Sequence, residues 1–116
     1  MDIRTLLFVA IGGMIGAASR WGLLEILPDD NCWPWQIFIV NMTGSFILGF
    51  IVSKPFQRLS PRSISALATG LCGSFTTFSM FSLDVTELLR SNQITAAWTY
   101  LGLSVIGGLI LFSLSY

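Results

Sequence analysis

The chain has 116 residues, of which only 12 are charged, six basic and six acidic, and its mean hydropathy is +0.76. Charged residues make up 10% of the chain, against roughly 25% in a typical soluble domain, and a small soluble protein needs polar groups to cover its large surface. The net charge is zero, and there are two cysteines and no histidine. These numbers exclude a soluble enzyme, a nucleic-acid binder and a disulfide-stapled secreted domain.

Long uncharged runs between the charged residues predict membrane spans. A transmembrane helix needs about 20 apolar residues, so four such helices use most of the chain and leave only short loops. The expected helices, within one membrane domain of residues 1–116, cover these ranges: 4–26, 34–53, 62–90 and 93–115. Prolines mark the ends of these ranges, at Pro28, Pro55 and Pro61. The function therefore has to lie inside the bilayer.

Basic residues favour one expected side of the membrane only weakly. With four helices, the amino terminus, the middle loop and the carboxyl terminus share a side. That side carries four basic residues, namely Arg4, Lys54, Arg58 and Arg62. The other side carries two, namely Arg20 and Arg90. Because Lys and Arg set the orientation of membrane proteins, this bias is compatible with insertion in both directions.

Small residues recur at helical spacing in several of the expected helices. Gly12 and Gly16 form a GxxxG pattern, Gly49 continues the four-residue steps of the second helix, and Gly107 and Gly108 are adjacent in the fourth. Such residues let two helices approach closely in a membrane. They predict tight helix association and an oligomer.

The middle of the second expected helix contains polar residues on one face. Asn41 and Ser45 lie about 40° apart around a helix, with Gly44 close by, so all three share one face. The Asn41 amide has two N–H donors. Two interpretations stay open for it, a ligand in an ion pathway and a contact that joins neighbouring helices.

The middle of the third helix is rich in weak helix formers. Residues 70–82 contain glycines, serines and two adjacent threonines, and this composition predicts a local break. At membrane depth, the carbonyl groups of a broken helix are tolerated where they line a cavity or bind an ion. Converging carbonyls would suit a small hard cation such as sodium. The alternative is a kink whose backbone groups bond to the threonine and serine hydroxyls.

Aromatic residues repeat every third position in the same stretch, at Phe75, Phe78 and Phe81. Such a stripe usually packs against a core or lipid. Here the rings alternate with the hydroxyls of Thr77 and Ser79. The edge of an aromatic ring is electropositive, so rings and hydroxyls together could solvate an anion without a fixed positive charge.

The fourth helix continues a hydroxyl-lined face with Tyr100 and Ser104, one turn apart, followed by Gly107 and Gly108. No Asp, Glu, Lys or His falls in the middle of an expected span, which argues for passive conduction rather than proton coupling. Arg20 is the one charge near a span interior. It extends to the interface, acts as a structural tether, or attracts anions at a vestibule.

Three motifs, in this order along the chain, resemble those of the Fluc family of small bacterial fluoride channels. They are GGxxGAxxR from residue 12, VNxxGSFxxG from residue 40 and GxCGxFTTFSxF from residue 70. The resemblance implies an all-α membrane protein with four transmembrane helices per subunit, the third of them broken near its middle. It also implies an antiparallel, dual-topology homodimer in the plasma (inner) membrane of a bacterium.

The function implied by the resemblance is passive, fluoride-selective export that gives fluoride resistance, without enzymatic activity. The family's structural sodium ion at the dimer centre is held by backbone carbonyls, which carry over to Gly73 and Thr76. Fluoride-pathway residues carry over to Asn41, Phe78, Phe81, Tyr100 and Ser104, and we add Thr77 and Ser79 to this pathway. One turn after Ser104, where a further hydroxyl would extend the track, this chain has Gly108.

Two other functions stay open at the level of sequence. A proton-coupled exporter of the small multidrug type has a similar length and number of spans. Those carriers have a membrane-buried glutamate in their first span, whereas Glu25 lies at the end of the first span here. The other possibility is a membrane subunit of a larger complex that does not conduct ions itself.

Overall fold

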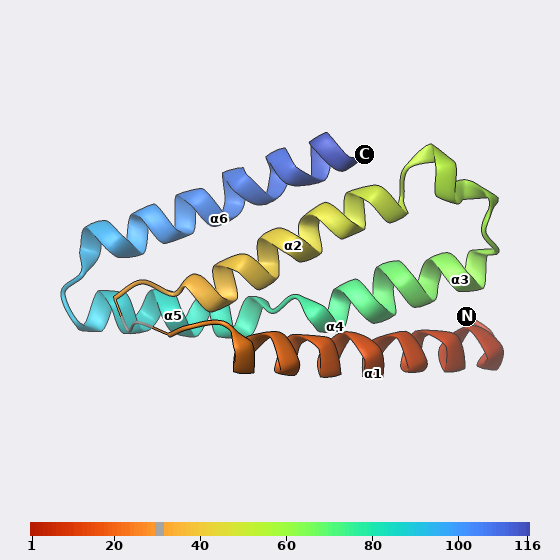
Figure 1. Cartoon of the computed structure of the whole chain (residues 1–116), viewed down its shortest axis with the longest axis horizontal. Helices are drawn as coiled ribbons and strands as arrows, with labels where there is room; N and C mark the ends of the chain where they lie inside the picture. Colours follow the sequence, from red (N-terminus) through yellow and green to blue (C-terminus); the bar gives the residue numbers. More distant parts are fainter. Residues whose placement is uncertain (30–31) are drawn as a thin grey trace.

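The computed structural model describes residues 1–29 and 32–116, and its regular structure in this part of the chain is entirely helical (Figure 1). The prediction of an all-α protein is confirmed. The elements are, in order, α1 (Ile3–Ile26), α2 (Trp35–Ile51), the short η1 (Lys54–Arg58), α3 (Pro61–Ser65), the π-helical η2 (Ala66–Cys72), α4 (Gly73–Phe75), α5 (Phe78–Arg90) and α6 (Ile94–Ser115). The segments from α3 to α5 together form the third expected span.

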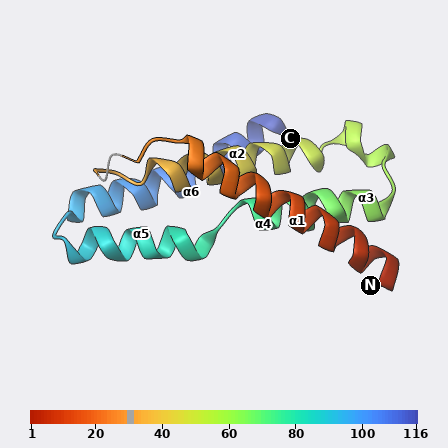
Figure 2. The same cartoon turned by 60° about the horizontal axis from the view of Figure 1, so that its bottom comes forward.

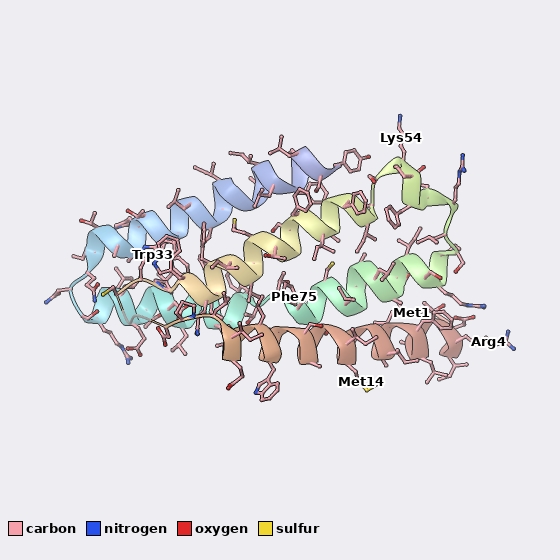
Figure 3. All side chains as sticks on the ribbon, viewed as in Figure 1. Met1, Arg4, Met14, Trp33, Lys54 and Phe75 are labelled. Atoms are coloured by element: carbon pink, nitrogen blue, oxygen red, sulfur yellow. The ribbon has the colours of Figure 1, made fainter. Side chains whose placement is uncertain are left out.

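The helices lie side by side in an elongated bundle that measures 48 × 26 × 25 Å (Figures 1 and 2). α1 packs along η2 and α4, while α2 packs along α6 and also touches both halves of the third span. The N-terminus and η1 lie at one end of the bundle, and the C-terminus lies in the same half (Figure 1). Met1, Arg4 and Lys54 accordingly lie at the end opposite to Trp33 (Figure 3).

Three helical segments are long and apolar enough to cross a membrane, by length and composition: α1, Pro61–Arg90 and α6. The fourth, α2, has 17 residues and is shorter than the expected range 34–53. At 1.5 Å per residue it measures about 25 Å, which is at the lower limit for a span. Pro34 before it and Pro55 after it explain why it does not extend further.

Side-chain caps fix the ends of α1 and the start of α3. Asp2 accepts a hydrogen bond from the Thr5 N–H over 2.9 Å at the start of α1. At the end of α1, Gln36 Nε2 donates to the Leu27 carbonyl over 2.8 Å. Ser60 caps α3, whose first residue is Pro61. Polar side chains thus satisfy backbone groups that a helix end leaves without partners.

The third span is interrupted at Thr76 and Thr77, inside the stretch 70–82 for which a break was expected. Both residues are extended, with φ/ψ of −80/159° and −148/118°. Thr77 also caps α5, because its hydroxyl oxygen accepts a hydrogen bond from the Met80 N–H over 3.2 Å. Consecutive β-branched residues that favour an extended backbone, one of them a good N-cap, account for the break.

A tight turn joins α5 to α6. Asn92 adopts a left-handed conformation, with φ 59°, directly after the end of α5. The Gln93 N–H donates to the Leu88 carbonyl over 2.9 Å, and the Asn92 N–H donates to the Leu89 carbonyl over 3.2 Å. This Schellman arrangement satisfies the last carbonyls of α5 and reverses the chain.

The glycines of α1 provide close packing within the subunit. A Cβ atom at Gly12 would collide with the Ala66 carbonyl of η2, and one at Gly16 would collide with the Leu71 carbonyl. The tight helix association predicted from these glycines is present, and it joins α1 to the third span of the same chain.

Large apolar side chains cover much of the outer surface. Met14, for example, projects away from the bundle (Figure 3) and is 65% exposed. The largest fully buried side chains are Tyr100 and Val40. An apolar exterior around a small interior suits a lipid environment, where outward-facing apolar groups need no cover.

Candidate functional site

A cleft of about 300 Å³ opens at the break of the third span, between α2 and α6. Its lining comes from α2, from the break itself and the residues beside it, and from α6. These residues are Asn41, Met42, Gly44, Ser45, Leu48, Cys72, Thr76, Thr77, Phe78, Phe81, Ser104 and Val105. None of them is charged, so the cleft presents only neutral polar groups, aromatic rings and apolar surface.

Five of the seven residues predicted for an ion pathway line this cleft together. They are Asn41, Thr77, Phe78, Phe81 and Ser104. Sequence reasoning also placed Ser45 and Gly44 on the face of Asn41, and both line the cleft. Met42, Leu48, Cys72 and Val105 were not singled out, because an apolar or thiol side chain inside a span carries no distinguishing pattern.

The hydroxyl of Ser104 is a buried polar group without a hydrogen-bond partner in the described part of the chain. Such a group costs about 1–3 kcal/mol when it stays unsatisfied. Ser104 lines the cleft, but its Oγ is buried, so the O–H meets a water molecule or an anion there only when neighbouring side chains move.

The rings of Phe78 and Phe81 lie next to each other, with their centroids 5.8 Å apart and their planes inclined by 38°. Phe78 is 79% exposed, so most of its ring is open to whatever occupies or covers the cleft. Their spacing of three residues places both at the start of α5.

Asn41 is attached to the break by two hydrogen bonds with one residue. Its Oδ1 accepts from the Thr77 N–H over 2.9 Å, and its Nδ2 donates to the Thr77 carbonyl over 3.2 Å. Of the two interpretations left open, the contact between neighbouring segments is therefore present. The cleft position is present as well, since Asn41 belongs to the lining.

The break redirects two backbone donors away from their helical acceptors. The Thr77 N–H donates to Asn41 rather than to the Gly73 carbonyl, its acceptor in an uninterrupted α-helix. The Met80 N–H donates to the Thr77 hydroxyl rather than to the Thr76 carbonyl. Gly73 and Thr76 are the residues whose carbonyls the family resemblance assigns to a sodium ion, and neutral carbonyl oxygens are suitable ligands for a small hard cation.

Two of the predicted pathway residues lie outside the cleft lining. The hydroxyl of Ser79 shares a hydrogen bond of 3.1 Å with that of Thr77. Tyr100 is completely buried, and its hydroxyl donates to Asp84 Oδ2 over 3.1 Å. Its ring packs against Phe81, which lines the cleft, at a centroid distance of 5.0 Å.

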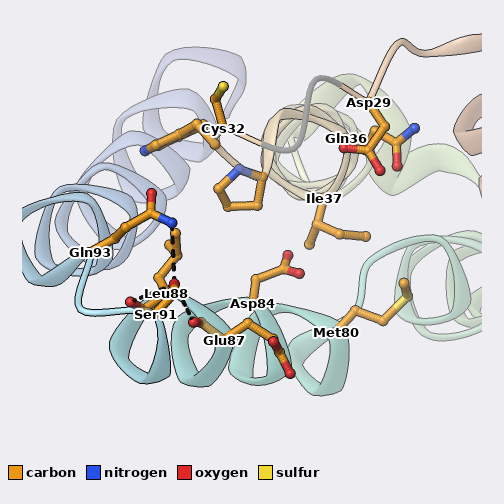
Figure 4. A pocket seen from close by; sticks show the side chains of 12 residues that line it. Asp29, Cys32, Gln36, Ile37, Met80, Asp84, Glu87, Leu88, Ser91 and Gln93 are labelled. Carbon is orange, nitrogen blue, oxygen red and sulfur yellow. Dashed lines mark hydrogen bonds between the residues drawn. The ribbon is translucent and has the colours of Figure 1, made fainter.

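Sequence reasoning did not assign a role to Asp84, although it lies within α5 and bonds to Tyr100. Together with Asp29 and Glu87 it faces a second cavity, of about 440 Å³, beside the loop before α2 (Figure 4). Nothing in the spacing of residues 84 and 100 links them, since they lie on different helices. The expectation that Arg20 is the one charge near a span interior was therefore wrong.

Arg20 lies on α1 and is half-buried, outside the lining of either cavity. In the structure as described, no hydrogen bond or ion pair involves its side chain; the one ion pair there joins Arg62 to Asp2. The vestibule role of Arg20 stays a prediction.

Comparison with known proteins places nearly all of the chain in one family. The family described as "CrcB-like protein, Camphor Resistance (CrcB)" matches residues 7–116. The chain belongs to this CrcB family. Among its CrcB relatives, proteins from Ignicoccus hospitalis and Methanococcus aeolicus are 39% and 38% identical over 113 and 110 residues. The matches cover 93% and 94% of this chain and 89% of each relative.

A CrcB relative from Stutzerimonas stutzeri is 38% identical over 114 residues, which cover 93% of this chain and 90% of the relative. All three relatives are named "Fluoride-specific ion channel FluC". With this membership and its long apolar helices, the chain is a multi-pass integral membrane protein, as predicted for the inner membrane of a bacterium.

Proposed function

We propose that the chain is a passive, fluoride-selective ion channel that lets fluoride leave the cytoplasm and so gives fluoride resistance. The observation that carries the proposal is the uncharged cleft, in which Asn41, Ser104, Phe78 and Phe81 meet. Fluoride is small and strongly hydrated, so a pathway has to replace the hydrogen bonds of its water shell. The names of the relatives, which are ion channels rather than enzymes, support the same function.

Neutral groups suit conduction better than a fixed charge would. An ion has to bind well enough to enter a channel and weakly enough to leave it. Asn41 has an N–H beyond the one bonded to Thr77, and Ser104 has an O–H without a partner in the described chain. These donors and the electropositive ring edges of Phe78 and Phe81 would hold fluoride transiently as it sheds water.

Passive transport follows from the absence of a titratable carboxylate, amine or imidazole among the described residues of the cleft. A proton-coupled exporter needs such a group at membrane depth. Glu25, the acidic residue nearest to that role in the first span, is exposed in the last turn of α1. Asp84, the acidic residue inside the third span, lies outside the cleft and bonds to Tyr100. Passive flow down the fluoride gradient is therefore the mechanism that the uncharged cleft supports.

A structural sodium ion fits the carbonyl groups at the break. Gly73 and Thr76 would supply these oxygens, since their helical donors bond elsewhere. When bound, sodium supplies positive charge at membrane depth close to the cleft. Thr77 and Asn41 hold the backbone in the extended form that leaves the two carbonyls available.

The functional unit in this proposal is a homodimer of two copies in opposite orientations, with lipid around it. Phe78, 79% exposed beside the cleft, would be covered by the second copy. The weak division of basic residues between the two ends of the bundle allows both orientations.

Reconstitution into liposomes tests the proposal. We expect rapid release of fluoride and little release of chloride from vesicles that contain the protein. Phe78→Ile, which removes a ring edge, should slow fluoride release at least about tenfold, corresponding to roughly 1.4 kcal/mol. Phe8→Ile, a change of the same kind on α1 away from the cleft, should leave release unchanged.

Three results would contradict the proposal in different ways. Equal fluoride and chloride release would remove the selectivity. Proton-driven uptake of a cationic dye would favour a multidrug-type exporter. A purified, stable protein without any ion flux would favour a non-conducting membrane subunit.

A further inference from the structure

The Asn41 side chain pairs with the Thr77 backbone as a neighbouring strand pairs with the edge of a β-sheet. Thr77 is extended, so its N–H and C=O point to the same side of the chain. The Asn41 amide meets both, with its oxygen on the N–H and its nitrogen on the carbonyl. A primary amide provides an acceptor and a donor side by side, whereas an ionised carboxylate provides only acceptors.

These two hydrogen bonds also affect the Gly73 carbonyl, which is one of the proposed sodium ligands. Without Asn41, the Thr77 N–H would have the Gly73 carbonyl as its nearest helical acceptor, four residues back. Because Asn41 accepts this N–H over 2.9 Å, the Gly73 carbonyl loses this helical donor. The amide on α2 therefore helps to keep the third span open at the break.

The same bonds also fix the direction of the remaining Asn41 donor. One N–H of Nδ2 is bonded to the Thr77 carbonyl, so the amide plane cannot rotate freely. Asn41 lines the cleft that contains Ser104 and Phe78. Any movement of the Thr77 peptide thus changes both the Gly73 carbonyl and the donor available in the cleft.

We propose that Asn41 is a positioning residue that couples the two ion sites through its paired hydrogen bonds with the Thr77 backbone. A cation bound to the Gly73 and Thr76 carbonyls stabilises the open break, which holds the Asn41 amide in place for the anion. By reciprocity, changes at Asn41 alter cation binding. This inference rests on the proposed function, because it needs both ions.

Two substitutions separate the two bonds. Asn41→Asp keeps an oxygen for the Thr77 N–H but places a negative charge in the anion cleft. Asn41→Leu removes both the acceptor and the donor. Thr43→Val serves as the control, since Thr43 is exposed on the same helix two residues away.

The purified full chain is first compared in sodium chloride and in N-methyl-glucamine chloride by thermal unfolding in detergent. Sodium should raise the melting temperature of the unchanged chain, Thr43→Val and Asn41→Asp alike. Asn41→Leu should lose this increase, because the Thr77 N–H can return to the Gly73 carbonyl. In liposomes, fluoride release through Asn41→Asp should be at least about tenfold slower than through the unchanged chain, because the new negative charge lies in the anion cleft.

A second measurement needs no variant, so it holds even if Asn41→Leu does not fold. Hydrogen exchange of the Thr77 amide is followed in the unchanged protein with and without sodium. At a sodium concentration about ten times its dissociation constant, linkage predicts roughly tenfold slower exchange at Thr77. A helical amide outside the cleft, such as that of Leu7 in α1, is the internal control.

Either of two results would overturn the inference: a full sodium effect in folded Asn41→Leu, or equal Thr77 exchange with and without sodium. Failure of the proposed function gives a different pattern. In that case the unchanged chain responds to sodium, and its Thr77 amide is protected, but its liposomes release no fluoride. The coupling of Asn41 to the cation site would then stand without a channel.

Discussion

At the scale of single residues, Asp84 is the least expected feature of the chain. It is an acidic residue inside the third span, half-buried, and its carboxylate accepts a hydrogen bond of 3.1 Å from the Tyr100 hydroxyl. An acidic group at this depth is costly unless it has a partner. Tyr100 is held in place by Trp33 and Phe81, whose ring centroids lie 5.1 and 5.0 Å from its own.

We predict that Tyr100→Phe destabilises the protein, because it removes the hydroxyl and leaves the Asp84 carboxylate without this donor. The expected loss in the free energy of unfolding is about 1–3 kcal/mol. Chemical unfolding in detergent measures it, with Tyr116→Phe as the control at an exposed position. A double-mutant cycle with Asp84→Asn should show that the two effects are not additive, and strict additivity would contradict the pairing.

At the scale of elements, the contact between α1 and η2 depends on glycine. The carbonyls of Ala66 and Leu71 occupy the space that a side chain at Gly12 or Gly16 would need. By contrast, a Cβ at Gly22, on the same helix, would meet nothing within 4 Å. Gly22 therefore serves as a control for Gly12 and Gly16 within α1.

Gly12→Ala and Gly16→Ala should each lower the melting temperature, since the added methyl group forces α1 away from η2 at a cost of about 1–3 kcal/mol. Gly22→Ala should be neutral or stabilise the protein by up to roughly 1 kcal/mol, because alanine favours a helix. Thermal unfolding of the three variants checks this order. Equal effects at Gly12 and Gly22 would show that helix propensity, not packing, controls these positions.

A second prediction at this scale concerns the start of α1. Hydrogen bonds from Thr5, and then the guanidinium of Arg62, lower the pKa of the Asp2 carboxyl from 3.8 to about 2. Since the pKa is lower in the folded state, the ionised carboxylate stabilises the fold fully above its unfolded pKa. This contribution is lost as the pH falls through about 2.

Asp2→Asn should therefore be less stable than the unchanged chain at about pH 6, and this difference should shrink as the pH approaches its folded pKa. Unfolding measured over this pH range tests the prediction. A difference that stays constant with pH would mean that the charge of Asp2 does not contribute.

Much of the element level follows from local sequence, and much of the residue level does not. Prolines and polar clusters near Pro28, Pro55 and Pro61 indicate the helix ends, because each acts on its own backbone. The break was predictable for the same reason, since adjacent threonines disfavour a helix wherever they lie. The π-helical winding of η2 has no such local signal.

The pairings across helices depend on three-dimensional arrangement instead. The sequence places Asn41 on a polar face but does not indicate that its partner is the Thr77 backbone, 36 residues away. Asp84 and Tyr100 were equally hidden as a pair. The GxxxG pattern predicts a close contact, but it does not tell whether the partner helix belongs to the same chain.

At the scale of the whole molecule, the bundle has an apolar exterior and basic residues at both ends. Arg4 and Lys54 lie at the end that carries the N-terminus, away from Trp33 (Figure 3). A bias of four basic residues against two is too small to impose one orientation strongly. This weak bias is compatible with the proposed insertion in both directions.

Dual insertion predicts the same labelling pattern at both ends of the bundle. In a chain whose own cysteines are replaced by alanine, Gln57→Cys and Asn92→Cys introduce exposed thiols in η1 and in the turn after α5. A membrane-impermeant maleimide added to intact cells should label a fraction of each variant. Full labelling of one and none of the other would demonstrate a single orientation.

The tight turn after α5 bears on how the chain enters the membrane. Residues 91–93 alone connect α5 to α6, so these two helices can insert together as a hairpin. Asp84 and Tyr100 face each other within that hairpin, and their hydrogen bond does not require α1 or α2. An aspartate at the centre of an inserting helix costs about 2.5–3.5 kcal/mol, and Asp84 costs less because it lies nearer to the end of the Pro61–Arg90 span. Here the hydroxyl donor lies in the same hairpin, so the partner that offsets this cost does not depend on α1 or α2.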